Sequence, residues 1–176
     1  TRQCSHLIIL DENHTSLLMK YNIPEYLPCD RAAELVTASF LFKDKACTVF
    51  DFGTTLTIDF LGVDGRYLGG NISLGCRTRT KALERYSKNL PLIDTPVSVQ
   101  PEGTSLESSI GSGVVLGIIF EIEGYIKAHG ENIVIFTGGD AIYFAKRMKS
   151  SIFVVCNLEL MGLAIITDDY VKKIIG

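Results

Sequence analysis

The sequence is poor in the residues that build metal sites and disulfide frameworks. It has no tryptophan, three histidines and five cysteines among 176 residues. The cysteines, at positions 4, 29, 47, 76 and 156, are odd in number, and no pair has metal-ligand spacing. This pattern argues against a disulfide framework and against a zinc site. Reduced thiols in a cytoplasmic protein fit it best.

The chain also lacks an excess of positive charge. Its formal net charge is −3, whereas a nucleic-acid-binding face usually shows as a surplus of Lys and Arg. The basic group Arg77, Arg79 and Lys81 fits a solvated helix face. No uninterrupted apolar run approaches the roughly 18 residues of a membrane span, and no signal peptide is visible. We therefore expect neither nucleic acid nor membrane as a partner.

What the chain does have is enough apolar material for a proper core. It is 47% hydrophobic and 21% charged, which is typical of a folded domain. The length corresponds to one domain or slightly more. Because the first residue is Thr1 rather than Met, we expect that residues upstream are absent from this sequence.

Hydrophobic periodicity predicts an α/β fold. An N-terminal strand is expected at 5–10, and a helix should follow Asp30, which stands where an N-cap residue would be. Three antiparallel strands are expected next, with a hairpin turn at 63–66. Helices and strands then alternate, which favours a mixed sheet. The predicted strands are 46–52, 54–61, 66–73, 132–137 and 152–156, and the predicted helices are 77–88, 105–128, 140–149 and 158–175.

The predicted helix 105–128 contains four glycines, at 111, 113, 117 and 124. Glycine weakens a helix, so four of them suggest close packing against another element. That element could be a partner subunit or the protein's own sheet.

Three short segments could carry chemistry. At Asp51 to Thr55, glycine would let backbone N–H groups approach a phosphate, and the aspartate could hold a cation. At 137–140 a strand ends in two glycines before a helix, which suits a nucleotide. At Asp30 and Arg31, a carboxylate could take a proton from an alcohol while the guanidinium holds an anion. Each segment alone also fits a plain structural role: a turn, a tight strand-to-helix connection or a helix cap.

In order and spacing, these segments resemble the type III pantothenate kinases of the acetate-and-sugar-kinase and actin superfamily, which include relatives first described as Bvg accessory factors. The resemblance runs from about Tyr21 to the C-terminus. It rests on five stretches: YNIPEYLPCDR (21–31), VFDFGTTLTID (49–59), YLGGNISLG (67–75) with the later Ala-Leu and Leu-Pro pairs, FTGGD (136–140) and NLELMGL (157–163).

The resemblance implies a ribonuclease H-like fold, with residues 1–44 as the tail of a first actin-like half and 45–176 as the second half. It implies transfer of the γ-phosphoryl group of ATP to pantothenate, with Mg²⁺ and a monovalent cation such as K⁺ or NH4⁺, in a cytoplasmic homodimer. Carried over by position, the roles are the following: Asp30 as general base; Tyr21 and Arg31 as pantothenate contacts; Asp51, Gly53, Thr54 and Thr55 near the phosphates, with Asp51 at the cation; Gly138 and Gly139 against the adenosine.

The sequence departs from the family pattern in four places. The N-terminal Asp-x-Gly-Asn-Thr motif has no counterpart. Pro28 replaces the glycine of Gly-x-Asp-Arg and has no N–H to offer. Ser105 and Leu106 stand where asparagine and a substrate-binding threonine are usual, and Leu74 replaces a proline. These departures keep two alternatives open: a non-catalytic relative that binds a nucleotide or a protein partner, and a dimerising structural fragment.

Overall fold

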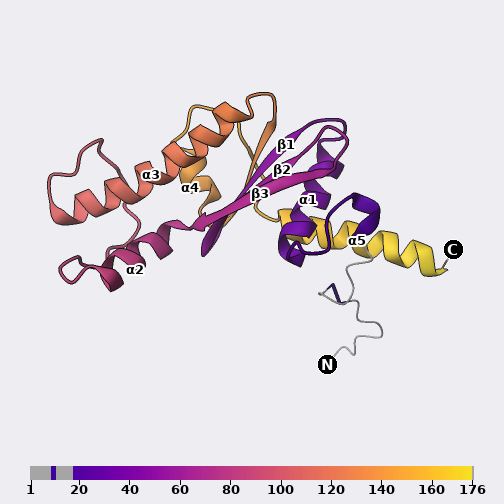
Figure 1. The fold of residues 1–176 in the computed structure, drawn as a ribbon, viewed down its shortest axis with the longest axis horizontal. Helices are drawn as coiled ribbons and strands as arrows, with labels where there is room; N and C mark the ends of the chain where they lie inside the picture. The colour runs from indigo at the N-terminus through magenta and orange to yellow at the C-terminus, as the bar shows by residue number, and fades with distance from the viewer. Residues whose placement is uncertain (1–8, 11–17, 176) are drawn as a thin grey trace.

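The structure is a computed structural model that describes residues 9–10 and 18–175. Its centre is a five-stranded sheet in the order β3-β2-β1-β4-β5, with helices on both faces (Figure 1). The strands are β1 (Cys47–Phe52), β2 (Thr55–Leu61), β3 (Tyr67–Leu74), β4 (Ile133–Gly138) and β5 (Phe153–Val154). The helices are η2 (Met19–Tyr21), α1 (Cys29–Leu41), α2 (Cys76–Tyr86), α3 (Leu106–Ala128), α4 (Ala141–Ala145) and α5 (Leu158–Ile175).

The sheet is mixed, as the sequence predicts. β1, β2 and β3 form an antiparallel meander, and β1, β4 and β5 run parallel to one another. Parallel neighbours need a crossover connection; α2 and α3 lie between β3 and β4 in the chain, and α4 lies between β4 and β5. The predicted α/β fold with a ribonuclease H-like sheet is confirmed.

One face of the sheet packs against α3 and α4 (Figure 1). Phe50, Phe52 and Phe136 from the central strands meet the fully buried Ile118 and Ile122 of α3. Edge-to-face and tilted ring pairs join the three phenylalanines. This face carries the larger apolar core.

The opposite face packs against α1 and α5, which lie side by side (Figure 1). Val49 and Ile135 of the sheet meet Leu35 of α1 and Leu158 of α5. The two helices approach very closely, because a side chain on Gly162 would overlap the backbone of Ala33. This packing holds α1 and α5 together over the sheet. The predicted division at residue 44 concerns the ancestry of the two parts and stays a prediction.

The start of α1 corrects one expectation. Asp30 is not the N-cap residue; the N-cap is Pro28, and Asp30 lies in the first turn. The carbonyl of Pro28 already accepts from the Ala32 N–H at 2.9 Å, so the helix starts before Asp30. The Asp30 carboxylate accepts from the next backbone N–H, that of Arg31, at 2.7 Å. A carboxylate there also complements the positive helix end.

Two later elements are shorter than predicted. The helix expected at 140–149 ends at Ala145, because Arg147 and Met148 donate to carbonyls only three residues back and so tighten the chain into a turn. The strand expected at 152–156 pairs only at Phe153–Val154. Most of the strand expected at 5–10 lies outside the described residues.

The glycine-bearing helix α3 packs less tightly than expected. A side chain on Gly111 would meet Pro96 at 3.1 Å, but additions at Gly113 and Gly124 would meet nothing within 4 Å. The expectation of close packing within the chain is therefore right only at Gly111. By length and composition alone, α3 could also cross a membrane, which the search for an uninterrupted apolar run missed. Here it is a core helix, with Ile118 and Ile122 fully buried against the sheet.

Candidate functional site

Three polar residues lie in one row across the centre of the sheet, on the face that α1 and α5 cover. Asp51 of β1 pairs with Thr57 of β2 and with Thr137 of β4. We call Thr57, Asp51 and Thr137 the polar row. Residues paired in register point to the same face of a sheet, with their Cβ atoms roughly 5 Å apart. The row therefore places a carboxylate between two hydroxyls where the parallel strands β1 and β4 end.

Asp51 also lies against Gly138, the last residue of β4. Gly138 has a positive φ of 86°, and an added side chain there would overlap the Asp51 carboxylate and lie 2.6 Å from the Phe52 nitrogen. Gly139 has open space on its side-chain side. The structure thus brings together two segments that are separated by more than 80 residues in the sequence.

The turn between β1 and β2 is held from behind by the start of α2. The Thr54 carbonyl accepts from the Gly75 N–H at 3.0 Å and from the Thr78 hydroxyl at 2.7 Å. The Gly53 N–H donates within the turn, to the Thr55 carbonyl at 3.0 Å. The side chains of Thr54 and Thr55 are exposed. In this conformation the turn therefore offers the threonine hydroxyls, rather than the Gly53 amide, to a ligand.

Asp30 projects from the first turn of α1 and is exposed. It lies near enough to Asp51 to influence its ionisation. Burial raises the pKa of Asp51, and the carboxylates of Asp30, Glu159 and Asp59 raise it further. The candidate base and the candidate cation ligand therefore share one negative region above the strand ends.

Arg31 forms a buried, bidentate ion pair with Asp59 of β2. Its Nε donates to one carboxylate oxygen at 2.9 Å, and Nη2 donates to the other at 2.5 Å. The pair fits because Gly70 of β3 has no side chain, where a Cβ would come within 2.8 Å of Arg31 Nη2. Nη2 also approaches the Tyr67 hydroxyl at 3.4 Å. Asp59 thus neutralises much of the charge that Arg31 would offer to an anionic substrate.

Tyr21 has a different partner from Arg31. Its hydroxyl and the Lys20 ammonium group both donate to the Asp169 carboxylate of α5. Burial and this carboxylate raise the pKa of Tyr21. In this structure the Tyr21 hydroxyl therefore ties the loop before α1 to α5. Its predicted contact with substrate stays a prediction.

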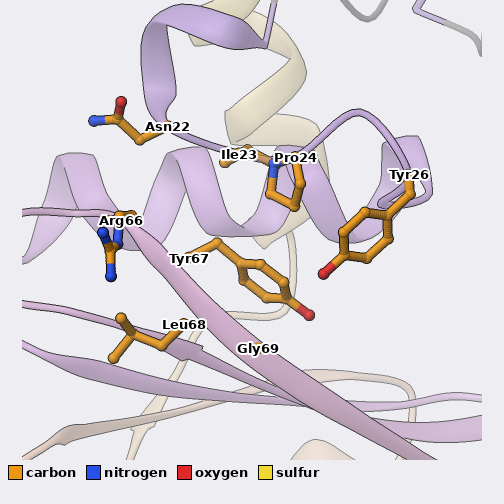
Figure 2. Close-up of a pocket in the computed structure, with 8 residues that line it drawn as sticks. All are labelled: Asn22, Ile23, Pro24, Tyr26, Arg66, Tyr67, Leu68 and Gly69. Carbon is orange, nitrogen blue, oxygen red and sulfur yellow. The ribbon is translucent and has the colours of Figure 1, made fainter.

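A cavity of about 430 Å³ lies beside the Arg31 pair. Figure 2 shows the rings of Tyr26 and Tyr67 tilted toward each other at one end, with Asn22 and Arg66 at the other. Asp59 and burial raise the pKa of Tyr67 to about 12, with burial the larger cause. Tyr67 lines this cavity, and its hydroxyl lies 3.4 Å from Arg31 Nη2. The cavity combines apolar walls with the Arg66 guanidinium and the phenol rings of Tyr26 and Tyr67.

Two departures from the family pattern can be located in the structure. Ser105 caps α3: its hydroxyl accepts from the Ser108 N–H, and the Ser108 hydroxyl accepts from the Ser105 N–H. Leu106 begins α3 and is half exposed. Pro28 is exposed at the start of α1.

Sequence reasoning missed the buried polar residues beneath the site. Glu34 is 5% exposed and Thr57 is 6% exposed, and each has a side-chain oxygen with no hydrogen-bond partner. The signal for Glu34 was a charged residue within an apolar helical stretch, four positions after Asp30. The Asp59 partner of Arg31 could be found only from the strand register.

The chain is similar in sequence to the members of one family. The sequence model of the family described as type III pantothenate kinase matches residues 2–128. A type III pantothenate kinase from Phocaeicola vulgatus is 42% identical over 147 residues, which cover 81% of this chain and 61% of the relative. One from Cytophaga hutchinsonii is 42% identical, covering 81% and 63%. One from Porphyromonas gingivalis is 38% identical over 172 residues, covering 92% and 70%. The chain thus spans about three fifths of the length of the first two relatives.

Solved structures share the fold at lower sequence identity. A Campylobacter jejuni protein, titled as a Baf family transcriptional activator, aligns with a TM-score of 0.67 and 24% identity, covering 88% of this chain and 72% of its own. A Sinorhizobium meliloti protein described as a 2-dehydro-3-deoxygalactonokinase aligns with a TM-score of 0.58 and 15% identity, covering 80% of this chain and 59% of its own. MreB 5 of Spiroplasma citri, bound to AMPPNP, aligns with a TM-score of 0.54 and 12% identity, covering 84% and 60%. These likenesses support the actin-like, sugar-kinase fold.

Proposed function

Because this chain belongs to the type III pantothenate kinase family, we propose that the protein carrying it transfers the γ-phosphoryl group of ATP to pantothenate. The product would be 4′-phosphopantothenate, the first intermediate on the route to coenzyme A. The observation that carries the proposal is the contact of Asp51 with Gly138 where β1 and β4 end, with the Asp30 carboxylate near enough to raise the pKa of Asp51. The alternative of a non-catalytic relative is not favoured, since the curated relatives are named as kinases.

Phosphoryl transfer needs positioning and charge neutralisation more than covalent chemistry. Exposed Asp30 would accept the proton of the attacking hydroxyl as general base. The hydroxyls of Thr54 and Thr55, and the open space beside Gly139 next to Gly138, would receive the nucleotide. Arg31 and Tyr21 would contact the acceptor directly, or would position the residues that surround it.

We also propose that the reaction uses Mg²⁺ with ATP and a monovalent cation such as K⁺ or NH4⁺, and the residues present fit both in part. Among residues 9–10 and 18–175, no three His, Cys, Asp or Glu side chains gather as a metal site. Mg²⁺ would therefore be held mainly by phosphate oxygens, with Asp51 nearby, and would neutralise their charge. A monovalent cation suits the polar row, where Asp51 lies opposite the unpartnered Thr57 hydroxyl.

We also propose that the protein is a cytoplasmic homodimer that pairs through α3. The outer side of this helix exposes Phe120 beside Gly113 and Gly117, and additions at these two glycines would meet at most the tip of Arg79, at 3.8 Å. Leu106 and Tyr86 add exposed apolar area nearby. A second copy of α3 would cover this surface.

The test is product formation by the full-length protein. ATP, Mg²⁺, K⁺ and pantothenate are supplied, and 4′-phosphopantothenate is measured by mass spectrometry. We expect product from the natural protein and a loss of about 10²- to 10⁴-fold in rate for Asp30→Asn. Absence of product from a folded natural protein would reject the proposal.

A further inference from the structure

The Arg31 guanidinium is held by two of its three nitrogens. Nε and Nη2 donate to the two carboxylate oxygens of Asp59, at 2.9 and 2.5 Å, and Nη2 also approaches the Tyr67 hydroxyl at 3.4 Å. The side chains of Arg31 and Asp59 are only 10% and 2% exposed. A guanidinium and a carboxylate joined by two parallel bonds share a fixed geometry. The pair therefore sets the direction of every N–H group of Arg31.

The third nitrogen, Nη1, is left for a ligand. Within the described part of the chain, no residue accepts a hydrogen bond from Nη1. The fully buried side-chain atoms without a partner in that part are Glu34 Oε2 and Thr57 Oγ1 alone, so Nη1 keeps some access to solvent. Arg31 thus presents one nitrogen, with two N–H groups, from an otherwise buried side chain. Because a guanidinium stays charged, Nη1 suits an anion.

The close fit of β3 keeps the pair in place. An added Cβ on Gly70 would overlap the Asp59 carboxylate and lie 2.8 Å from Arg31 Nη2 and 2.6 Å from the Ile58 carbonyl oxygen. Gly70 pairs with Asp59 in the strand register, so its missing side chain makes room for the ion pair. The position of the guanidinium therefore depends on β2 and β3 as well as on α1.

Asp59 can affect an anionic ligand in two opposite ways. Its charge lies on the guanidinium edge formed by Nε and Nη2, and would repel an anion bound at Nη1. Its two hydrogen bonds also hold Nη1 in one place before the ligand arrives. A donor that is already ordered binds more tightly, because a free arginine side chain loses rotamer freedom when a ligand fixes it.

We propose that Asp59 is a positioning residue that directs Arg31 Nη1 toward the carboxylate of the acceptor, and that this orienting effect outweighs its repulsion. The inference rests on the proposed function, since it takes the acceptor to be an alcohol that also carries a carboxylate, as pantothenate does. The carboxylate would be held by one guanidinium nitrogen rather than by a two-bonded clamp, because Asp59 already occupies that edge of Arg31.

Three substitutions separate position from charge. Asp59→Asn removes the charge and keeps the shape of the side chain. Gly70→Ala keeps both charges and displaces the pair. Tyr67→Phe removes only the hydroxyl beside Nη2, so it should fold whatever the other two variants do. Asp64→Asn is the matched control, because Asp64 is an exposed carboxylate in the turn between β2 and β3.

The experiment is titration calorimetry of the full-length protein without ATP, using pantothenate and panthenol, the neutral ligand in which an alcohol replaces the carboxylate. Circular dichroism checks that each variant is folded. The ratio of the two Kd values reports the carboxylate contact, because the rest of the ligand is shared. The natural protein should prefer pantothenate by about tenfold or more.

We expect this preference to fall about tenfold in Asp59→Asn and Gly70→Ala, and about two- to threefold in Tyr67→Phe. It should be unchanged in Asp64→Asn. The Kd for panthenol should stay within about threefold of the natural value in every folded variant, because panthenol has no anion for Nη1 to hold. A merely structural role for the pair would instead weaken both ligands together.

Three results would overturn the inference: tighter pantothenate binding in Asp59→Asn, which would make Asp59 a counter-charge; equal weakening of both ligands; or an unchanged preference in Gly70→Ala and Tyr67→Phe. If Asp59→Asn does not fold, the other two variants decide by the same criteria.

Failure of the proposed function would look different. A preference that the variants lose, in a natural protein that forms no phosphopantothenate, would keep the role of Asp59 and reject the kinase. Product formation with a preference that every variant keeps would do the reverse. A natural protein that binds neither ligand and forms no product would reject both.

Discussion

Replacing Gly162 by alanine should force α1 and α5 apart. A Cβ at this position would lie 2.5 Å from the Ala33 carbonyl carbon and 2.9 Å from its Cα, with the carbonyl oxygen closer still. Carbon atoms ordinarily rest about 3.5 Å apart, so the helices would have to separate by about 1 Å. The obstacle is backbone, which cannot turn aside as a flexible side chain could. The separation would loosen the core around Leu35 and Leu158.

The cost can be estimated from two opposing effects. Overpacking of a tight core costs about 1–3 kcal/mol, and a backbone clash belongs at the upper end. Alanine regains about 1 kcal/mol over glycine in helix propensity. The free energy of unfolding should therefore fall by about 2 kcal/mol, and Tm should drop by roughly 4–8 °C.

The assay is urea unfolding of the full-length protein, followed by circular dichroism. Gly124→Ala is the control, because it also lies in a helix but has nothing within 4 Å. It should gain about 0.5–1 kcal/mol. If Gly162→Ala is as stable as Gly124→Ala, the close approach of α1 and α5 is wrong.

Three further predictions concern the site. Arg31→Met should lower the free energy of unfolding by about 3–5 kcal/mol in urea, because it leaves the buried Asp59 carboxylate unpaired. Adding Asp59→Asn should recover most of this loss, and a double variant no more stable than the single one would contradict the ion pair. Burial and nearby carboxylates raise the pKa of Glu34 from 4.5 to about 9, so the folded protein holds a proton that the unfolded chain releases. In choline buffer the free energy of unfolding should therefore fall as pH rises between these values, by at most ~1.4 kcal/mol per pH unit. Glu34→Gln should flatten this slope, and an unchanged slope would refute the raised pKa of Glu34. Gly138→Ala should lower Tm markedly, since its φ is 86° and the Phe52 backbone blocks a Cβ. Gly139→Ala should leave Tm unchanged and weaken ATP binding measured by titration calorimetry. Equal Tm values for the two variants would contradict the geometry of this turn.

The strands and the long helices could be predicted because their patterns are local. Strand β1 and helix α5 carry continuous apolar periodicity, and their observed limits lie within one residue of the expected ones. The start of α1 was missed because the capping rule favours aspartate, whereas the Pro28 carbonyl begins the helix here. Helix α4 ended early because of hydrogen bonds to carbonyls three residues back, which periodicity does not show.

The candidate site could be predicted in part. Asp51 and Gly138 were identified from separate motifs, and the structure brings them into contact. The partner of Arg31 depends on the strand register and on the missing side chain of Gly70, neither of which the sequence states directly. Glu34 lies inside the helix predicted after Asp30, and periodicity alone does not show that its carboxylate is buried.

The most direct test of the central claim compares the steady-state kinetics of the natural full-length protein with those of Asp30→Asn, using ATP and pantothenate. Glu25→Gln, an exposed acid in the loop before α1, is the control. The account predicts that kcat falls about 100-fold or more in Asp30→Asn, with both KM values within about threefold of the natural ones, because this side chain would act on the proton rather than on binding. A kcat within about fivefold of the natural protein would show that Asp30 is not the base.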